Sequence, residues 1–207
     1  MKPSKTPAGA KRPDEEAIVG LRIIGGTLRG RRLQYSGEMR TRPMKDRVRE
    51  AVFNLLGPDV KGSHAIDLFA GTGALGLEAL SRGAAQATFI ERHYPTAKLI
   101  EENIAALQIV TPTKVVFADA FGWTKHFQRT GDEPLTVFCS PPFDFYVDRQ
   151  AEMLTLVARW IELGPVGSQI VVEADERFDF GTLAGAGSWD VRQYFPAVVG
   201  VFEKKAM

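Results

Sequence analysis

A glycine-rich stretch, DLFAGTGALG at residues 67 to 76, combines residue types that can bind a nucleotide-like ligand. Gly71, Gly73 and Gly76 satisfy the spacing G-x-G-x-x-G between a strand-like run and a helical run. Glycines there permit a tight turn and a close approach of the backbone to a ligand. Glu91 ends the next strand-like run, where a carboxylate can accept hydrogen bonds from ribose hydroxyls. A glycine turn followed by an unrelated surface glutamate would give the same pattern.

Two further features favour S-adenosylmethionine over a dinucleotide. Asp67, at the head of the glycine loop, suits a ligand with a cationic amino group and a sulfonium and would repel a pyrophosphate. Asp119 and Ala120 follow the third strand-like run, suitably placed for an adenine amino group, although Asp119 could equally be a helix N-cap. A nicotinamide-dependent dehydrogenase stays open as an alternative. The residues expected at the cofactor are Asp67, Phe69, Gly71, Gly73, Glu91, Arg92, Asp119 and Ala120.

The fourth strand-like run ends in FCSPPFDFY, residues 138 to 146, which carries the candidate catalytic residues Ser140, Pro141, Pro142 and Phe143. Two prolines make a rigid turn at the carboxyl end of a strand, where α/β folds bind ligands. Such a turn can direct hydrogen-bond acceptors at an exocyclic amine while an aromatic ring stacks on a flipped base. A structural proline turn with a core phenylalanine is the alternative. Cys139 could be a nucleophile, but a buried packing role fits its place on a strand better.

Strands alternating with helices from residue 64 onward predict an α/β fold with a mostly parallel sheet. The end differs, since WDVRQYF and AVVGVFEK flank Pro196 without a helix between them, which predicts an antiparallel hairpin at one edge. Upstream, LRIIGGTLRGRRLQY predicts another hairpin, and a helix is expected to start near Thr41 and Pro43 and to stop at Gly57-Pro58.

Charge divides the chain into two opposed parts. Residues 22 to 49 carry nine basic side chains against two acidic ones, whereas residues 50 to 207 carry 13 basic and 20 acidic ones. A cationic segment joined to an acidic body is expected when one region meets a polyanion, although a solvated charge run is the alternative. The residues expected to bind RNA phosphates are Arg29, Arg31, Arg32, Arg42, Lys45 and Arg49, the last two sharing a helix face away from the apolar stripe.

The remaining features of the composition limit which classes of protein this chain could belong to. One cysteine excludes an internal disulfide, the N-terminus has no signal-peptide core, and no run approaches the ~20 apolar residues of a membrane span. A cytoplasmic protein without a membrane anchor is expected, and scattered histidines indicate no metal site. We expect a monomer with a disordered tail at 1–18, a basic RNA-binding hairpin and helix at 19–58, and an S-adenosylmethionine-binding catalytic domain at 59–207.

The chain resembles the RsmD family of small-subunit ribosomal RNA guanine N2-methyltransferases. The similar stretches are RIIGGTLRGRRL, TRPMKDRVREAVFNLL, DLFAGTGALGLEALSRGA with FIER following, and the proline turn, so the resemblance runs from about Leu21 to Phe202. It implies a Rossmann-like class I methyltransferase fold with a seven-stranded sheet, S-adenosylmethionine as donor, and 16S ribosomal RNA or an assembling small subunit as partner.

One position departs from that family, which has Asp or Asn before the two prolines where this chain has Ser140. A serine hydroxyl can still accept a hydrogen bond, but it is neutral and shorter and can engage its own proton elsewhere. Asp144 is a candidate for compensation. Two alternatives therefore stay open beside guanine methylation: a non-catalytic RNA-binding or assembly factor, and the same chemistry on another nucleic acid.

Overall fold

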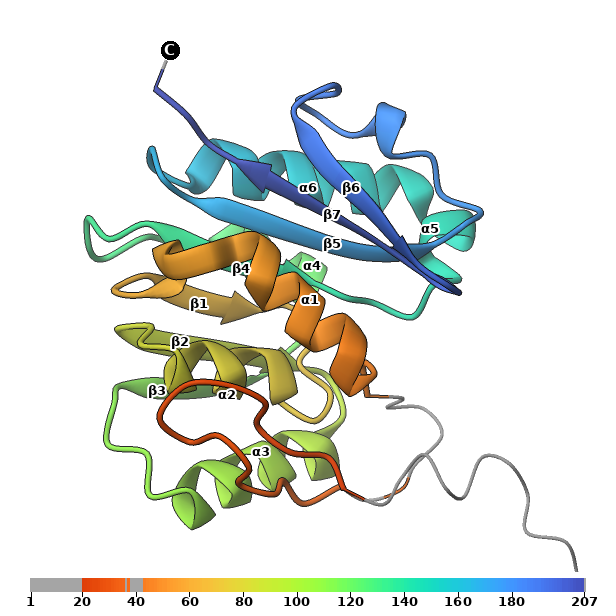
Figure 1. Cartoon of the computed structure of the whole chain (residues 1–207). Helices are drawn as coiled ribbons and strands as arrows, with labels where there is room; N and C mark the ends of the chain where they lie inside the picture. The colour runs from red at the N-terminus through yellow and green to blue at the C-terminus, as the bar shows by residue number, and fades with distance from the viewer. Residues whose placement is uncertain (1–19, 36, 38–42, 207) are drawn as a thin grey trace, which may run out of the picture.

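A computed structural model describes residues 20–35, 37 and 43–206 (Figure 1). Its centre is a seven-stranded sheet in the order β3-β2-β1-β4-β5-β7-β6. The first five strands along the chain are parallel, and β7 pairs antiparallel with both β5 and β6. The predicted fold, including the antiparallel C-terminal hairpin, is confirmed. The strands are β1 (His64–Asp67), β2 (Gln86–Glu91), β3 (Thr113–Phe117), β4 (Leu135–Cys139), β5 (Gln169–Asp175), β6 (Trp189–Tyr194) and β7 (Ala197–Glu203).

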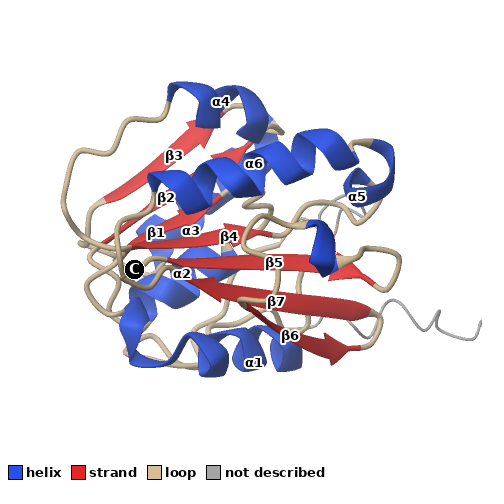
Figure 2. Cartoon of the chain, turned by 90° about the horizontal axis from the view of Figure 1, so that it is seen from above, coloured by secondary structure: helices blue, strands red, loops and turns tan. Residues whose placement is uncertain are grey.

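Helices cover both faces of the sheet, and Figure 2 shows α1, α2 and α3 on one face with α4, α5 and α6 on the other. Parallel strands need such cover, and β1 and β4 are buried over their whole lengths. The edge strand β6 is largely exposed and carries Asp190 and Arg192, charges that discourage pairing with another chain. The helices are α1 (Asp46–Leu56), α2 (Ala74–Ser81), α3 (Tyr94–Ala106), α4 (Ala120–His126), α5 (Phe145–Asp148) and α6 (Gln150–Leu163), with 3-10 turns η2 (Gly57–Val60) and η3 (Phe180–Thr182).

The sheet order reverses direction beside β1, which makes this the topological switch point. From β1 the chain moves outward to β2 and β3, then returns to place β4 against the other side of β1. The registers Asp67↔Phe89 and Asp67↔Phe138 bring the carboxyl ends of β2, β1 and β4 to one edge of the sheet. Open α/β folds bind ligands in the crevice at such an edge.

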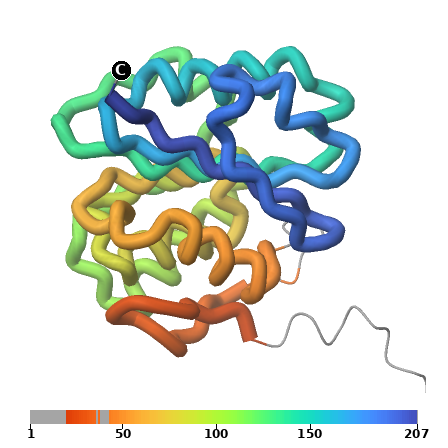
Figure 3. The backbone as a smooth tube through the Cα atoms, turned by 45° about the horizontal axis from the view of Figure 1, so that its top comes forward, coloured from red at the N-terminus to blue at the C-terminus, as the bar shows by residue number. Residues whose placement is uncertain are grey.

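The N-terminal segment packs on the α1–α3 face and shares its apolar core (Figure 3). Its predicted hairpin forms as a single antiparallel bridge between Arg22 and Arg32. The loop between them bonds instead to the carboxyl end of α2, because Glu78 accepts from the backbone N–H groups of Ile24 and Gly25 at 2.7 Å each. The division of the chain into three parts stays a prediction, and the tail at 1–18 lies outside the described residues.

Helix α1 begins at Asp46, with Lys45 at the N-cap position, rather than near Thr41 and Pro43. Pro43 precedes the helix in the non-helical lead-in, and Thr41 lies outside the described residues. The predicted end is correct, since α1 stops at Leu56 and Gly57 follows with φ 63°, a conformation that glycine adopts without strain.

Candidate functional site

A cavity of about 630 Å³ opens at the switch point. Its walls come from the loops after β1, β2, β3 and β4, from the carboxyl end of β5, from the start of α1 and from the β6–β7 turn. Six of the eight residues expected at a cofactor line it, and so does the whole Ser-Pro-Pro-Phe turn. These lining residues are Phe69, Gly71, Glu91, Arg92, Asp119, Ala120, Ser140, Pro141, Pro142 and Phe143.

The glycine loop has the backbone that its spacing predicts. Gly71 and Gly73 have φ of 50° and 75°, and Gly73 is the N-cap residue of α2. A Cβ on Gly76 would lie 2.3 Å from the Phe89 ring, so this third glycine lets α2 pack closely against β2. Gly73 does not line the cavity, and a Cβ added to it would lie 3.0 Å from the Ile100 side chain.

Asp67 is buried beneath this loop, with an exposed fraction of 1%. Its Oδ2 accepts a hydrogen bond of 3.1 Å from the Gly76 N–H, whereas its Oδ1 is buried with no hydrogen-bond partner. Burial raises the pKa of Asp67 to about 7, opposed by the Gly76 bond and assisted by the nearby Glu91 carboxylate. A buried acceptor with an unused oxygen can take a hydrogen bond from a ligand or an ordered water.

Glu91 joins the glycine loop to the end of β2. Its Oε2 accepts from the Gly71 N–H at 2.9 Å and its Oε1 accepts from the His93 N–H at 2.8 Å. Each carboxylate oxygen has a second lone pair, so both can still accept a hydroxyl hydrogen bond from the cavity. The carboxylate therefore fixes the loop and remains available to a ligand.

Asp119 is the N-cap of α4, and its Oδ2 accepts from the Gly122 N–H at 2.9 Å. The capping interpretation is thus confirmed, and the same residue also lines the cavity. Beside it lies an aromatic cluster that the sequence analysis did not single out. The Phe69 ring meets Phe121 and Phe145 edge-on at 5.9 Å and 6.0 Å, and Arg92 lies over Phe145 at 5.7 Å.

The Ser-Pro-Pro-Phe turn leaves β4 and faces the same cavity. The Ser140 hydroxyl donates a hydrogen bond to Glu173 Oε2 on the neighbouring strand β5, a partner that the sequence analysis missed. Asp144 was a candidate to compensate for Ser140, but it does not line the cavity. Its carboxylate is 73% exposed and pairs with Arg177 at 2.9 Å, outside the cavity.

Cys139 packs in the core with an exposed fraction of 1%, and burial raises its pKa to about 12. A thiol in that state is a poor nucleophile, so the packing interpretation is favoured. Among the described side chains, no group of three or more potential ligands could hold a metal ion. Within the same residues no helix has the length and apolar content needed to cross a bilayer.

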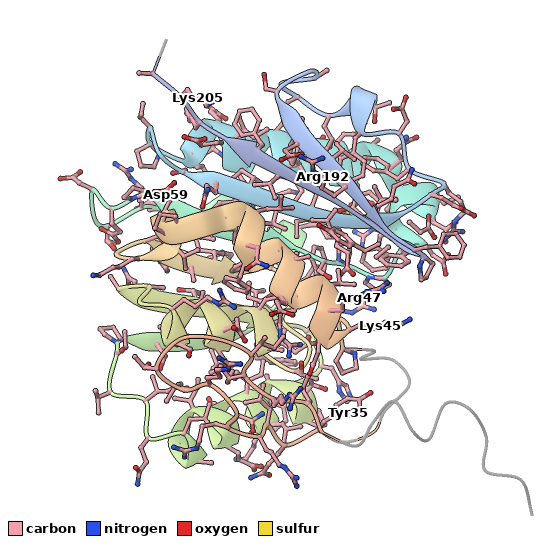
Figure 4. All side chains as sticks on the ribbon, in the orientation of Figure 1. Tyr35, Lys45, Arg47, Asp59, Arg192 and Lys205 are labelled. Carbon is pink, nitrogen blue, oxygen red and sulfur yellow. The ribbon has the colours of Figure 1, made fainter. Side chains whose placement is uncertain are left out.

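The basic residues expected at RNA divide into four groups: exposed side chains, one that lines the cavity, one outside the described residues and one that is buried. Arg29 and Arg32 are exposed, Arg31 is exposed and donates to the Ala106 carbonyl at 3.2 Å, and Lys45 lines the cavity. Figure 4 shows Lys45 and Arg47 projecting from the amino end of α1. Arg42 lies outside the described residues.

Arg49 requires a correction, because its side chain is 0% exposed and cannot reach a phosphate. It donates to the Arg22 carbonyl at 2.6 Å and to Asp46 at 2.9 Å, and it lies 3.8 Å from the fully buried Glu78. Desolvation lowers its pKa, while the Asp46 and Glu78 carboxylates oppose that shift. Arg49 therefore ties the N-terminal segment to α1 and α2.

A family model described as "Conserved hypothetical protein 95" matches residues 21–190. The chain belongs to this family. The resemblance to RsmD proteins is confirmed by a member from Escherichia coli (strain K12) named "Ribosomal RNA small subunit methyltransferase D", which is 41% identical over 133 residues. That match covers 64% of this chain and 65% of the relative, just under two thirds of the relative's length.

Solved structures share the fold over most of this chain. A putative methyltransferase, yhhF from Escherichia coli, is 30% identical with a TM-score of 0.74, covering 91% of this chain and 99% of that one. The Thermus thermophilus 16S rRNA N2 G1207 methyltransferase RsmC, in complex with AdoMet and guanosine, is 20% identical with a TM-score of 0.66. That likeness covers 90% of this chain and 50% of the other and concerns the fold alone.

Proposed function

We propose that this protein is an S-adenosylmethionine-dependent methyltransferase that modifies the exocyclic N2 amine of a guanine in 16S ribosomal RNA. The observation that carries the proposal is that one cavity is lined both by the glycine loop with Glu91 and by the Ser-Pro-Pro-Phe turn. A donor and an acceptor base could therefore meet in a single space. The names of its relatives, which are ribosomal RNA methyltransferases, support the same substrate class.

The residues of the cavity fit S-adenosylmethionine. Asp67 does not line the cavity, but its Oδ1 atom, buried beneath the glycine loop, is an acceptor without a partner, which suits the cationic amino group of this ligand. Glu91 would accept from the ribose hydroxyls, Asp119 and Ala120 would face the adenine, and Phe69 and Arg92 would line the same wall. When bound, S-adenosylmethionine supplies a methyl group on a sulfonium, which an amine lone pair can attack directly.

The chain's own contribution to catalysis would be positioning. Ser140 and the Pro141 carbonyl would accept from the target amine, and Phe143 would stack on the flipped base. Acceptors on the amine N–H groups hold its lone pair toward the methyl group, and the proton released afterwards can pass to water. Arg29, Arg31, Arg32 and Lys45, with Arg42, would bind RNA phosphates. The enzyme would act as a monomer in the cytoplasm, where subunits assemble.

The test is transfer of labelled methyl from S-adenosylmethionine to small ribosomal subunits that lack the modification, with protein-free 16S RNA in parallel. Nuclease digestion of the product identifies the methylated nucleoside. Label in N2-methylguanosine is the expected result. Absence of label from both substrates, in protein that binds S-adenosylmethionine, would favour a non-catalytic assembly factor, and label in an adenine product would move the chemistry to another base. Binding of a nicotinamide cofactor instead would favour the dehydrogenase alternative.

A further inference from the structure

Glu173 is a buried carboxylate in the cavity wall to which the proposed chemistry assigns no role. It lies on β5, one residue beyond the Cys139↔Val172 pair that joins β4 to β5, with an exposed fraction of 7%. Its Oε2 accepts the hydrogen bond from Ser140, and it forms no ion pair with any described basic side chain. Burial raises the pKa of Glu173, and the Ser140 bond opposes the rise. A carboxylate buried without a cation is costly, so its presence at a ligand cavity requires an explanation.

The hydrogen bond between the two side chains decides what they offer to a ligand. The Ser140 hydroxyl has one hydrogen, and it donates this hydrogen in the bond to Glu173. Its oxygen can therefore only accept further hydrogen bonds from the cavity. The carboxylate likewise has only acceptor sites when ionised. The pair therefore presents neighbouring acceptors and no donor.

Only some bases have an edge whose donors match these two neighbouring acceptors. Guanine carries two adjacent donors there, the ring N1–H and the exocyclic N2 amine. Adenine and cytosine place an unprotonated ring nitrogen beside their amines, and that nitrogen would face an acceptor with no hydrogen between them. Leaving a buried acceptor unpaired is costly, and more so when it is charged, so the acceptor pair would reject both bases.

We propose that Glu173 and Ser140 act as one unit that recognises the target guanine, Glu173 accepting from N1–H and Ser140 from the N2 amine. This assignment rests on the proposed guanine methylation. It makes Glu173 a residue that selects the base and orients its amine toward the methyl group. It also gives Ser140 a defined role, since the carboxylate fixes the serine hydroxyl as an acceptor.

The test uses Glu173→Gln, which keeps the shape of the side chain but replaces one acceptor with an N–H₂ donor. Glu176→Gln is the matched control, the same substitution at an exposed position three residues along the chain. Both proteins are assayed for methyl transfer to unmodified small subunits, for binding of S-adenosylmethionine and for thermal unfolding. We expect Glu173→Gln to lower kcat about 100-fold with KM for the subunit within about twofold, because the RNA surface that sets KM lies elsewhere. Cofactor affinity should stay at the wild-type value in both variants.

A second comparison tests whether the two residues act as a unit. Ser140→Ala should lower kcat in the same direction, and the double variant should be no slower than Glu173→Gln alone. The inference is overturned if Glu173→Gln keeps kcat within threefold of wild type, or if its loss of activity follows loss of cofactor binding or of folding. If wild-type protein transfers no methyl to guanine, the proposed function itself fails, and that result precedes any measurement on the variants.

Discussion

Asp67 illustrates how one buried carboxylate can couple ligand binding to protonation. In the free protein its pKa is raised to about 7, so near neutral pH a large share of molecules carry a proton there. The amino group of S-adenosylmethionine would favour the ionised form, and binding would then release that proton. Affinity for this ligand should therefore fall as the pH drops below 7.

We expect the dissociation constant of S-adenosylmethionine to rise roughly five- to tenfold between pH 7.5 and pH 6, a range in which an α-amino group stays largely protonated. Asp67→Asn should bind more weakly at pH 7.5 and lose this pH dependence, because its amide still accepts from Gly76 but cannot ionise. Isothermal titration calorimetry measures both effects. Asp59→Asn, at an exposed position in η2 beyond the end of α1, is the control (Figure 4). The same pH profile in Asp67→Asn and wild type would contradict the assignment.

Protonation of Asp67 also changes the free energy of unfolding with pH, in a direction that its raised pKa determines. A carboxyl whose pKa is raised on folding stabilises the folded state most at low pH, and this contribution is lost as the pH rises from about 4 through about 7. In the absence of ligand, Asp67→Asn should therefore lose less free energy of unfolding than wild type over that interval. Urea unfolding at pH 5 and pH 8 measures the difference.

At the level of residues, the sequence predicted best those side chains whose position follows from where a strand ends. Gly71, Glu91, Asp119 and Ser140 lie at or just after the ends of parallel strands, and parallel strands place their carboxyl ends at the same edge of the sheet. Glu173 was missed because its partner, Ser140, lies 33 residues away and only the β4–β5 register brings them together. Arg49 was misplaced for the same reason, since Glu78 is visible as its neighbour only once α1 and α2 are packed.

Among the elements, the least predictable is the N-terminal loop, because several of its hydrogen bonds reach outside the segment to α2. Two strand-like runs on either side of a glycine-containing connection predicted a hairpin, and its two arms do meet at Arg22 and Arg32. Between them, the Thr27 N–H bonds to the Ser81 carbonyl at 2.8 Å and the Leu28 N–H to the Ser81 hydroxyl at 2.9 Å. The carboxyl end of α2 thus adds to the few bonds between the two arms, such as that from the Ile23 N–H to the Arg31 carbonyl at 2.9 Å.

Gly26 is the residue that allows this close approach. A Cβ there would lie 1.9 Å from the Ser81 carbonyl oxygen, and its φ is 73°. Gly30→Ala is a matched control, since its φ is 83° but a Cβ would meet nothing within 4 Å. Both substitutions carry the left-handed backbone strain of roughly 1–2 kcal/mol, and Gly26→Ala should lose about a further 1–3 kcal/mol from the clash.

Hydrogen exchange separates the two variants by location. In Gly26→Ala the amides of Thr27 and Leu28 should exchange faster, because their bonds to Ser81 are displaced, whereas Gly30→Ala should leave them protected. Methyl transfer to the small subunit should fall with Gly26→Ala while S-adenosylmethionine still binds. Equal exchange in the two variants would show that the loop does not depend on Ser81.

At the scale of the whole molecule, one basic side chain lines the cavity and others lie on the same face of the sheet. Lys45 lines the cavity at the amino end of α1, and Arg47 projects beside it, while the exposed Arg29 and Arg32 belong to the N-terminal loop on the same face of the sheet (Figures 1 and 4). The remainder of the chain is acidic on balance. An RNA backbone would be drawn to the basic segment and repelled elsewhere, which would bring a base to the cavity mouth.

This arrangement predicts the salt dependence of RNA binding. Each phosphate contact that is removed should reduce the slope of log K against log salt by about 0.7–0.9, so the double variant Arg29→Ala/Arg32→Ala should reduce it by up to about 1.4–1.8. Arg159→Ala on α6, across the sheet, removes a cation that already pairs with Glu162 at 2.7 Å and should leave the slope unchanged. Fluorescence anisotropy with labelled 16S RNA between 50 and 200 mM salt, a range in which such contacts dominate affinity, measures both slopes. A slope that changes with Arg159 and not with the loop arginines would place the RNA on the opposite face of the sheet.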